Sequence, residues 1–271
     1  MKTLVQNFTT QLNEAKAIAD KAIISSSQNI QNIVITGLGG SGIGGTIISE
    51  LISDSCTVPI TINKDYFLPA FVNANTLLIV SSYSGNTEET LSAMQQAITK
   101  KAQIVCITSG GKVLELAKQH QFDFIEIPGG NPPRSFIAHS LVQLIKVLVE
   151  KGFADKKLFS DLENSIALLD KEVIAIKTEA QKIAGKLVNK ICVIYSLGTC
   201  EGAVVRFRQQ INENSKMLCW HHVFPEMNHN ELVGWTTKND NLVVVTFHTS
   251  FDYARTKKRY DVCKPIFEKY S

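Results

Sequence analysis

Residues 81–90 of the chain read SSYSGNTEET and are rich in side-chain hydroxyls. An apolar run at residues 77–80 precedes them and helically spaced apolar residues follow at 91–99, which predicts a turn from a buried strand into a helix. A helix start offers unpaired backbone N–H groups and the positive end of the helix dipole, so it can hold an anion. Neutral hydroxyl donors would come from Ser82, Ser84 and Thr87. Because no lysine accompanies them, the pattern favours the phosphate of a small molecule over a nucleoside triphosphate.

The same residue types also have a purely structural use. Ser, Thr and Asn are the usual N-caps of helices, where their side chains accept hydrogen bonds from backbone N–H groups. From this segment alone, a well-capped helix and an anion site therefore remain equally open.

A second predicted strand-to-helix turn is rich in glycine. Residues 32–36 predict a strand, residues 37–45 read GLGGSGIGG, and residues 46–52 predict a helix. One interpretation is purely structural: the glycines at this point let the helix pack closely on the strand. Even in that case, Gly40 and Ser41 would offer backbone donors near a helix start.

The glycine-rich turn also contains the spacing G-x-G-x-x-G of dinucleotide-binding proteins. Its glycines are Gly37, Gly39 and Gly42, and Asp65 after the next strand could contact a ribose. That fold would leave the hydroxyl-rich turn without a role. We therefore place NAD(P) binding below the binding of a phosphorylated sugar.

Composition restricts the class of protein. The chain has 271 residues, an apolar fraction of 44% and a net charge of +3, which fits a globular protein and is too small a charge to indicate a nucleic-acid partner. Six cysteines without a CxxC pair favour a reducing cytoplasm over a disulfide scaffold or a zinc site. We expect no signal peptide, because residues 1–13 lack an apolar core, and no membrane-spanning segment. A cytoplasmic location is the resulting expectation.

Strands and helices alternate along the predicted chain, which indicates parallel sheets with helices on both faces. We expect one domain at residues 1–150, and a segment at 151–271 that consists of a helical connection and a second domain. Ligands of such sheets bind beyond the carboxyl ends of the strands, where the three loops at 39, 81 and 128 would lie. The expected strands are 32–36, 58–63, 75–80, 103–108, 123–127, 190–196, 216–221 and 242–247. The expected helices are 4–24, 46–52, 91–99, 112–119, 135–149, 200–212 and 253–270, with breaks at 25–28 and 197–199.

Five segments in a fixed order resemble a known family. They are GGSG at 39–42, SYSGNTEET at 82–90, PGGNPPR at 128–134, NENSK at 212–216 and PEMNHNE at 225–231. Together they resemble the bifunctional phosphoglucose/phosphomannose isomerases, over nearly the whole chain. The resemblance implies an α/β fold made of two SIS-type (sugar isomerase) αβα sandwich domains with parallel sheets.

The resemblance also implies a reaction. It is the interconversion of glucose 6-phosphate, and of mannose 6-phosphate as a further substrate, with fructose 6-phosphate through a cis-enediolate. Glu213 would move the proton, His229 would open the sugar ring and Arg134 would stabilise the enediolate. The substrate phosphate would be held by Ser82, Ser84 and Thr87, near Gly40 and Ser41. The family uses no metal or cofactor and forms a homodimer in which that histidine reaches the partner's active site.

Each of these catalytic candidates also has an ordinary structural interpretation. Glu213 alone would be an exposed helix residue, although its neighbours Asn212 and Asn214 could orient it. Arg134 could form a surface salt bridge, and Arg206 a weak ion pair on the helix face. His221, His222 and His229 match no zinc-binding spacing, so we expect no metal site.

Two further expectations follow from the comparison with the family. Family members continue with another strand and a terminal helix that carries a lysine used in ring opening, and we expect this chain to lack them after Ser271. The alternative function is a non-catalytic SIS module that binds a sugar phosphate, for which the hydroxyl-rich turn would suffice.

Overall fold

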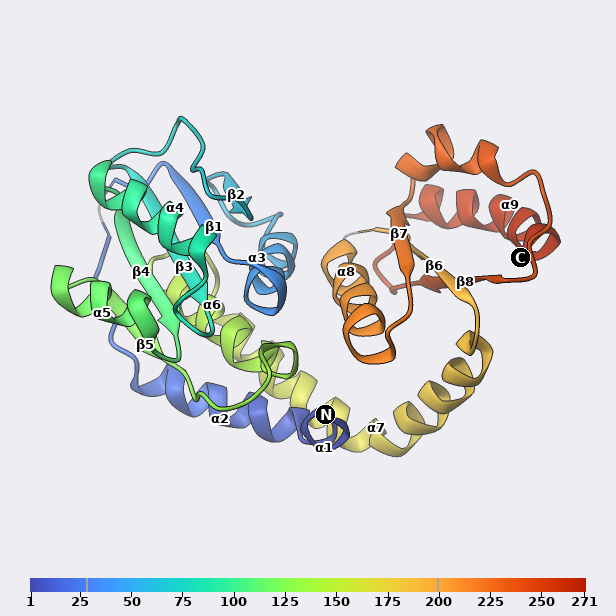
Figure 1. Ribbon diagram of the computed structural model, residues 1–271, viewed down its shortest axis with the longest axis horizontal. Coiled ribbons are helices and arrows are strands. Elements are labelled where there is room, and N and C mark those ends of the chain that lie inside the picture. Colours follow the sequence, from blue (N-terminus) through green and yellow to red (C-terminus); the bar gives the residue numbers. More distant parts are fainter. Residues whose placement is uncertain (28, 199) are drawn as a thin grey trace. The chain divides into compact units, whose positions relative to one another are not determined.

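The computed structural model describes residues 1–27, 29–198 and 200–271 of the protein (Figure 1). The chain divides into two compact units, Met1–Lys171 and Glu172–Ser271. The long helix α7 (Lys157–Leu187) begins in the first unit and ends in the second. Across the described residues, no helix combines the length and the hydrophobicity required to span a bilayer.

The first unit is built on five parallel strands in the order β2-β1-β3-β4-β5. Because the chain leaves β1 toward one edge of the sheet and β3 toward the other, the direction of winding reverses between these two neighbours. Such a switch point opens a crevice at the carboxyl ends of the strands, where ligands bind in doubly wound folds. The strands are β1 (Asn32–Thr36), β2 (Ile60–Asn63), β3 (Thr76–Ser82), β4 (Gln103–Thr108) and β5 (Asp123–Glu126).

Helices cover both faces of this sheet (Figure 1). Alternate residues of the central strand point to opposite faces: Leu77 and Ile79 belong to the core beneath α3 and α6, and Leu78 and Val80 to the core beneath α4 and α5. The short α1 (Lys2–Gln6) leads into α2, which packs on α6. The bounds are α2 (Phe8–Lys21), α3 (Gly39–Leu51), α4 (Glu88–Thr99), α5 (Gly111–His120) and α6 (Ile137–Glu150).

The second unit has a smaller parallel sheet in the order β7-β6-β8. Its strands are β6 (Ile191–Ser196), β7 (Cys219–Val223) and β8 (Leu242–Phe247). Helix α8 (Glu201–Gln210) packs on one face through Val204, and helix α9 (Ala254–Tyr270) packs on the other through Cys263 and Phe267. This unit is therefore also an αβα arrangement.

The predicted strands at 32–36, 103–108 and 242–247 begin and end as expected. The helix expected at 4–24 is interrupted at Asn7 and ends at Lys21. The strand expected at 216–221 lies at Cys219–Val223, because the backbone at Lys216 is left-handed and still closes the preceding helical turn. Gln28 and Thr199, within the expected breaks at 25–28 and 197–199, lie outside the described residues.

Candidate active site

Three loops of the first unit follow the carboxyl ends of β1, β3 and β5, and all belong to the same edge of the sheet. They are residues 37–42, residues 81–87 and residues 128–134. The first two flank the switch point between β1 and β3, where a doubly wound sheet offers its ligand crevice.

Glycine is required where the first loop meets its neighbours. A side chain at Gly37 would place its Cβ 2.5 Å from the Ser81 carbonyl oxygen, and one at Gly42 would come within 2.2 Å of the Gly37 carbonyl oxygen. A Cβ at Gly40 would lie 3.0 Å from the carbonyl oxygen of Pro133. The packing role of the glycines is therefore real, and it brings all three loops into contact. Helix α3 consequently starts at Gly39, seven residues earlier than the expected helix at 46–52.

Hydrogen bonds join the glycine-rich turn to the hydroxyl-rich turn. The backbone N–H of Tyr83 donates to the hydroxyl oxygen of Ser41 over 3.0 Å, and the Ser81 hydroxyl donates to the Ser41 carbonyl over 3.1 Å. Ser81 and Ser82 are the last residues of β3, paired with β4, whereas the sequence placed them in the turn. The strand thus holds these two serines in a fixed, buried position at the edge of the sheet.

Tyr83 connects all three loops, a role that no pattern in the sequence indicates. Its carbonyl accepts hydrogen bonds from the backbone N–H and the hydroxyl of Ser109, over 2.9 and 2.6 Å. Its phenol oxygen accepts one from the backbone N–H of Asn131 over 3.0 Å, and its ring meets that of Phe136 edge-on. The side chain therefore fixes the position of the loop that carries Arg134.

The hydroxyl-rich turn is not used to cap its helix. Thr87 occupies the N-cap position of α4, yet its side chain makes no capping hydrogen bond. Its Oγ1 instead accepts a hydrogen bond from the Ser82 hydroxyl over 3.3 Å, and the Ser84 hydroxyl accepts one from the Asn86 backbone N–H, also over 3.3 Å. The capping interpretation therefore does not hold for the side chain of Thr87.

Two carboxylates stand in the first turn of α4, at Glu88 and Glu89. They already complement the positive end of that helix dipole. An anion would therefore be bound by the hydroxyls and loop N–H groups of residues 82–87 more than by the axis of α4.

Arg134 lies in a single 3₁₀ turn, Pro133–Ser135, that follows the PGG segment. The Ser135 hydroxyl donates to the Pro132 carbonyl over 2.7 Å, which closes the turn together with the fixed φ angles of the two prolines. Arg134 is half-buried, and its backbone nitrogen would lie 3.5 Å from a Cβ at Gly40. The backbone of Arg134 thus lies beside the glycine-rich turn.

Glu213 belongs to the second unit, in a π-helical turn (Ile211–Ser215) that extends α8. The side chain of Lys216 donates to the Glu213 carbonyl over 2.7 Å and closes this turn. The amide of Asn212 donates to the Met217 carbonyl and to Cys219 Sγ, so the expectation that Asn212 orients the Glu213 carboxylate is wrong. The asparagine instead fixes the turn to the strand that follows it.

Arg206 is the charged group that does interact with Glu213. Burial lowers the pKa of the Arg206 guanidinium, and the Glu213 carboxylate opposes that shift. Because the arginine is half-buried, this interaction is screened less than the surface ion pair expected from the sequence. Glu213 itself is half-buried.

His229 is the last residue of a 3₁₀ turn, Glu226–His229. Burial and hydrogen bonds fix the other side chains of this turn. Met227 is fully buried, and Asn228 donates to Cys263 Sγ over 3.1 Å. Asn230 donates to Glu226 over 2.9 Å, and its amide oxygen lies 3.1 Å from His222 Nε2. The histidine itself is exposed, so its imidazole is presented from a fixed backbone.

Glu231 fixes the other side of this segment. Its carboxylate accepts hydrogen bonds from the Tyr195 hydroxyl and, over 3.4 Å, from Trp220 Nε1. Trp235 Nε1 donates in turn to the Tyr195 oxygen over 3.0 Å. Burial of Tyr195, followed by its hydrogen bond to Glu231, raises the pKa of the phenol, which therefore remains a neutral donor. The glutamate of the NHNE segment is thus a structural partner of the histidine-bearing turn.

The other histidines of the segment have structural contacts. His221 Nε2 lies 3.5 Å from Glu201, and burial together with the charge of Arg208 lowers the pKa of His221. His222 accepts the Val223 backbone N–H through Nδ1. In the part of the chain that is described, no group of three His, Cys, Asp or Glu side chains is arranged to hold a metal ion.

The structure therefore brings six of the predicted site residues onto neighbouring loops of the first unit: Gly40, Ser41, Ser82, Ser84, Thr87 and Arg134. Glu213 and His229 lie in the second unit, on a π turn and a 3₁₀ turn respectively.

Known proteins are similar to this chain in fold and in sequence. The C-terminal domain of glucosamine-fructose-6-phosphate aminotransferase from Francisella tularensis superposes with a TM-score of 0.72 over 99% of this chain and 78% of that one, at 15% identity. This likeness confirms the predicted α/β fold of SIS type with two parallel sheets.

Sequence comparison is more specific. Residues 176–271 match the family described as bacterial phospho-glucose isomerase C-terminal SIS domain. The bifunctional phosphoglucose/phosphomannose isomerase of Caldicellulosiruptor bescii is 38% identical over 97% of this chain and 81% of its own length. The protein of the same name from Aquifex aeolicus is 35% identical over 89% of this chain and 74% of its own length. The chain therefore belongs to the bifunctional phosphoglucose/phosphomannose isomerase family.

Proposed function

We propose that the protein interconverts glucose 6-phosphate and fructose 6-phosphate, and that it also accepts mannose 6-phosphate. The observation that carries the proposal is the convergence of three loops at the β1/β3 switch point in a chain of this family. A homodimer in the cytoplasm is part of the same proposal, in which His229 acts in the active site of the partner subunit.

In this reaction the phosphate is bound by the Ser82, Ser84 and Thr87 hydroxyls together with backbone N–H groups at Gly40 and Ser41. All of these donors are neutral. Fixing one end of the sugar in this way converts proton transfer into an intramolecular step.

The chemistry then takes three groups. His229 delivers a proton to the ring oxygen as the sugar opens, which suits an imidazole because its charge changes near neutral pH. The Glu213 carboxylate removes the proton from C2 of the aldose and returns it to C1 of the cis-enediolate, giving the ketose. Arg134 stabilises the negative charge on the enediolate oxygens. No metal or cofactor takes part in the proposed reaction.

The decisive experiment follows deuterium incorporation at C1 and C2 of the substrate by NMR in D2O, with the variant Glu213→Gln. The amide has the shape of the carboxylate but cannot accept the proton, so exchange and isomerisation should fall by at least about a thousandfold. Binding of fructose 6-phosphate, measured by calorimetry, should remain. Glu115→Gln, which makes the same chemical change in an exposed ion pair on α5, is the matched control and should behave as the wild type.

Isomerisation that persists in Glu213→Gln would refute the assignment of this residue. A wild-type protein that binds fructose 6-phosphate without isomerising it would instead support the alternative, a non-catalytic sugar-phosphate-binding module. Binding of NADH in place of the sugar phosphate would support the dinucleotide interpretation of the glycine-rich turn.

A further inference from the structure

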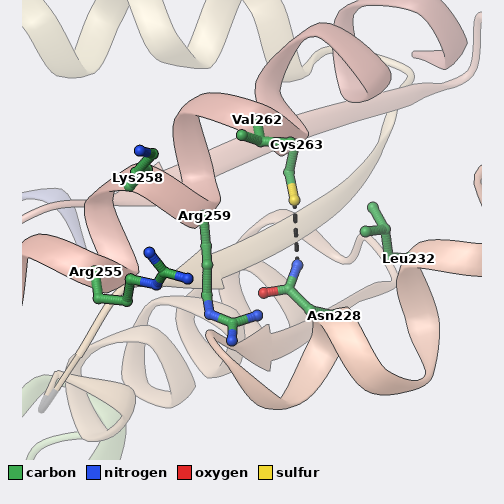
Figure 2. A pocket seen from close by; sticks show the side chains of 7 residues that line it. All are labelled: Asn228, Leu232, Arg255, Lys258, Arg259, Val262 and Cys263. Carbon is green, nitrogen blue, oxygen red and sulfur yellow. Dashed lines mark hydrogen bonds between the residues drawn. The ribbon is translucent and has the colours of Figure 1, made fainter.

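A cavity of about 410 Å³ opens in the second unit between α9 and the segment that follows β7 (Figure 2). It is lined from α9 by three cations, Arg255, Lys258 and Arg259, and has an apolar part formed by Leu232 and Val262. The proposed isomerase reaction gives none of these side chains a role.

The three cations occupy one face of the helix. Positions 255, 258 and 259 are three and four residues apart, so their side chains emerge as neighbours. No carboxylate lines the cavity, and none of the three pairs with an acidic side chain within the described residues. By contrast, Lys264 on the same helix lies 3.7 Å from Glu268. Like charges held together in this way repel, and a bound anion would remove that cost.

The wall of the cavity is fixed and carries no negative group. Figure 2 shows Arg259 reaching from α9, and Asn228 from the segment that follows β7, into the wall of the cavity. The amide oxygen of Asn228 is buried and has no hydrogen-bond partner among the described residues. The amide nitrogen of Asn228 donates to Cys263 Sγ over 3.1 Å, which holds the side chain in this orientation. Burial raises the pKa of the Cys263 thiol, so the sulfur stays neutral and does not act as the counterion.

We propose that this cavity binds the phosphate monoester of a small organic molecule. A guanidinium offers two parallel N–H groups that match two phosphate oxygens, and two arginines with a lysine can balance a dianion. The volume is that of a site for a whole small molecule and exceeds what a bare phosphate fills. Leu232 and Val262 would contact the apolar part of such a ligand. This site is separate in chemistry from the hydroxyl-rich turn of the first unit, which binds through neutral donors.

The test is calorimetric titration with phenyl phosphate and with inorganic phosphate at constant ionic strength, since screening alone changes such affinities. The double variant Arg255→Gln/Arg259→Gln removes the two guanidinium groups and should weaken phenyl phosphate binding about tenfold or more. Phenyl phosphate should bind more tightly than phosphate to the wild type, because only phenyl phosphate reaches the apolar wall.

Lys257→Gln/Lys264→Gln is the matched control. It removes the same charge from the same helix at positions that do not line the cavity, and it should bind as the wild type does. A second variant, Ser84→Ala/Thr87→Ala, changes the first unit only and should leave the α9 site intact. If the arginine variant does not fold, the single change Arg255→Gln at an exposed position is compared with Lys257→Gln, which removes one charge from the same helix outside the cavity.

Equal affinities in the arginine variant and the lysine control would overturn the proposal, because binding would then depend on net charge alone. Loss of all binding in Ser84→Ala/Thr87→Ala would overturn it as well, since the hydroxyl-rich turn would then be the site measured. Equal affinities of phosphate and phenyl phosphate would overturn the assignment of an organic ligand. Isomerase activity is a separate measurement and decides none of these outcomes.

Discussion

The backbone N–H of Tyr83 donates to the Ser41 hydroxyl oxygen over 3.0 Å, across 42 residues of sequence. The Ser81 hydroxyl donates to the carbonyl of the same serine. Neither bond uses the hydroxyl proton of Ser41, which stays available for a phosphate oxygen. Ser41 therefore joins two loops and still offers a donor to the proposed substrate.

Replacement of Ser41 by alanine should affect both stability and substrate binding. The Tyr83 N–H would lose its acceptor in a part-buried position, which should lower the free energy of unfolding by about 1–2 kcal/mol. The KM for the sugar phosphate should rise severalfold, with a smaller change in kcat, because the phosphate is bound equally in the ground and transition states. Urea unfolding and steady-state kinetics check the two effects.

Ser49→Ala is the control for this change, because Ser49 lies on the same helix and only donates to the Thr46 carbonyl. It should leave the KM unaltered. An unchanged KM in Ser41→Ala as well would contradict a role for this serine in phosphate binding.

Tyr195 should determine how firmly the His229 segment is held. In Tyr195→Phe, the Glu231 carboxylate keeps only the long bond from Trp220, and Trp235 Nε1 loses its acceptor. We expect the free energy of unfolding to drop by about 1–3 kcal/mol and backbone amides of residues 226–234 to exchange faster with D2O. If His229 opens the ring, kcat for the cyclic sugar should fall while affinity for the phosphosugar is kept.

Tyr253→Phe removes a hydroxyl from an exposed tyrosine and serves as the comparison. Unchanged amide exchange in Tyr195→Phe would show that the segment is held by its other contacts, chiefly those of Met227 and Asn228.

The strands were predictable because they are continuous apolar runs. A strand buried on both faces, such as β3, needs apolar residues at every position, and this leaves an unambiguous signal in the sequence. The loops that follow β1 and β3 were predictable as neighbours, because parallel strands bring their carboxyl ends to one edge of the sheet. The end of β3 was missed because Ser81 and Ser82 are buried polar residues, which resemble a turn when only composition is considered.

The contacts that complete the candidate site could not be predicted. Tyr83 joins Ser41 and Asn131 through bonds that span 42 and 48 residues, and no periodic pattern records such pairs. The same holds for Arg206, which looks like a surface helix residue in sequence but is half-buried and interacts with the charge of Glu213. The glycines of residues 37–45 predicted close packing of the helix on the strand, but the approach of Gly37 to Ser81 and of Gly40 to Pro133 appears only in three dimensions.

His139 should make the first unit sensitive to acid. Its side chain on α6 is fully buried, stacks on Phe136 with ring centroids 4.5 Å apart, and has Nε2 3.6 Å from the Glu14 carboxylate. Burial lowers the pKa of this imidazole, and Glu14 opposes that shift only in part. The folded state therefore takes up the proton less readily than the unfolded chain.

The sign of the effect follows from this difference. Stability should be fully present above the pKa of an unfolded histidine, about 6.5, and should be lost as the pH falls below it, by at most about 1.4 kcal/mol per pH unit. Urea unfolding between about pH 7.5 and about pH 5 measures this slope, and His139→Gln should flatten it. His221 in the second unit also has a lowered pKa. Because His221 is present in both the wild type and His139→Gln, the difference between their two slopes isolates the contribution of His139. Equal slopes would mean that the buried imidazole accepts a proton in the folded state, with Glu14 supplying enough negative charge to offset its burial.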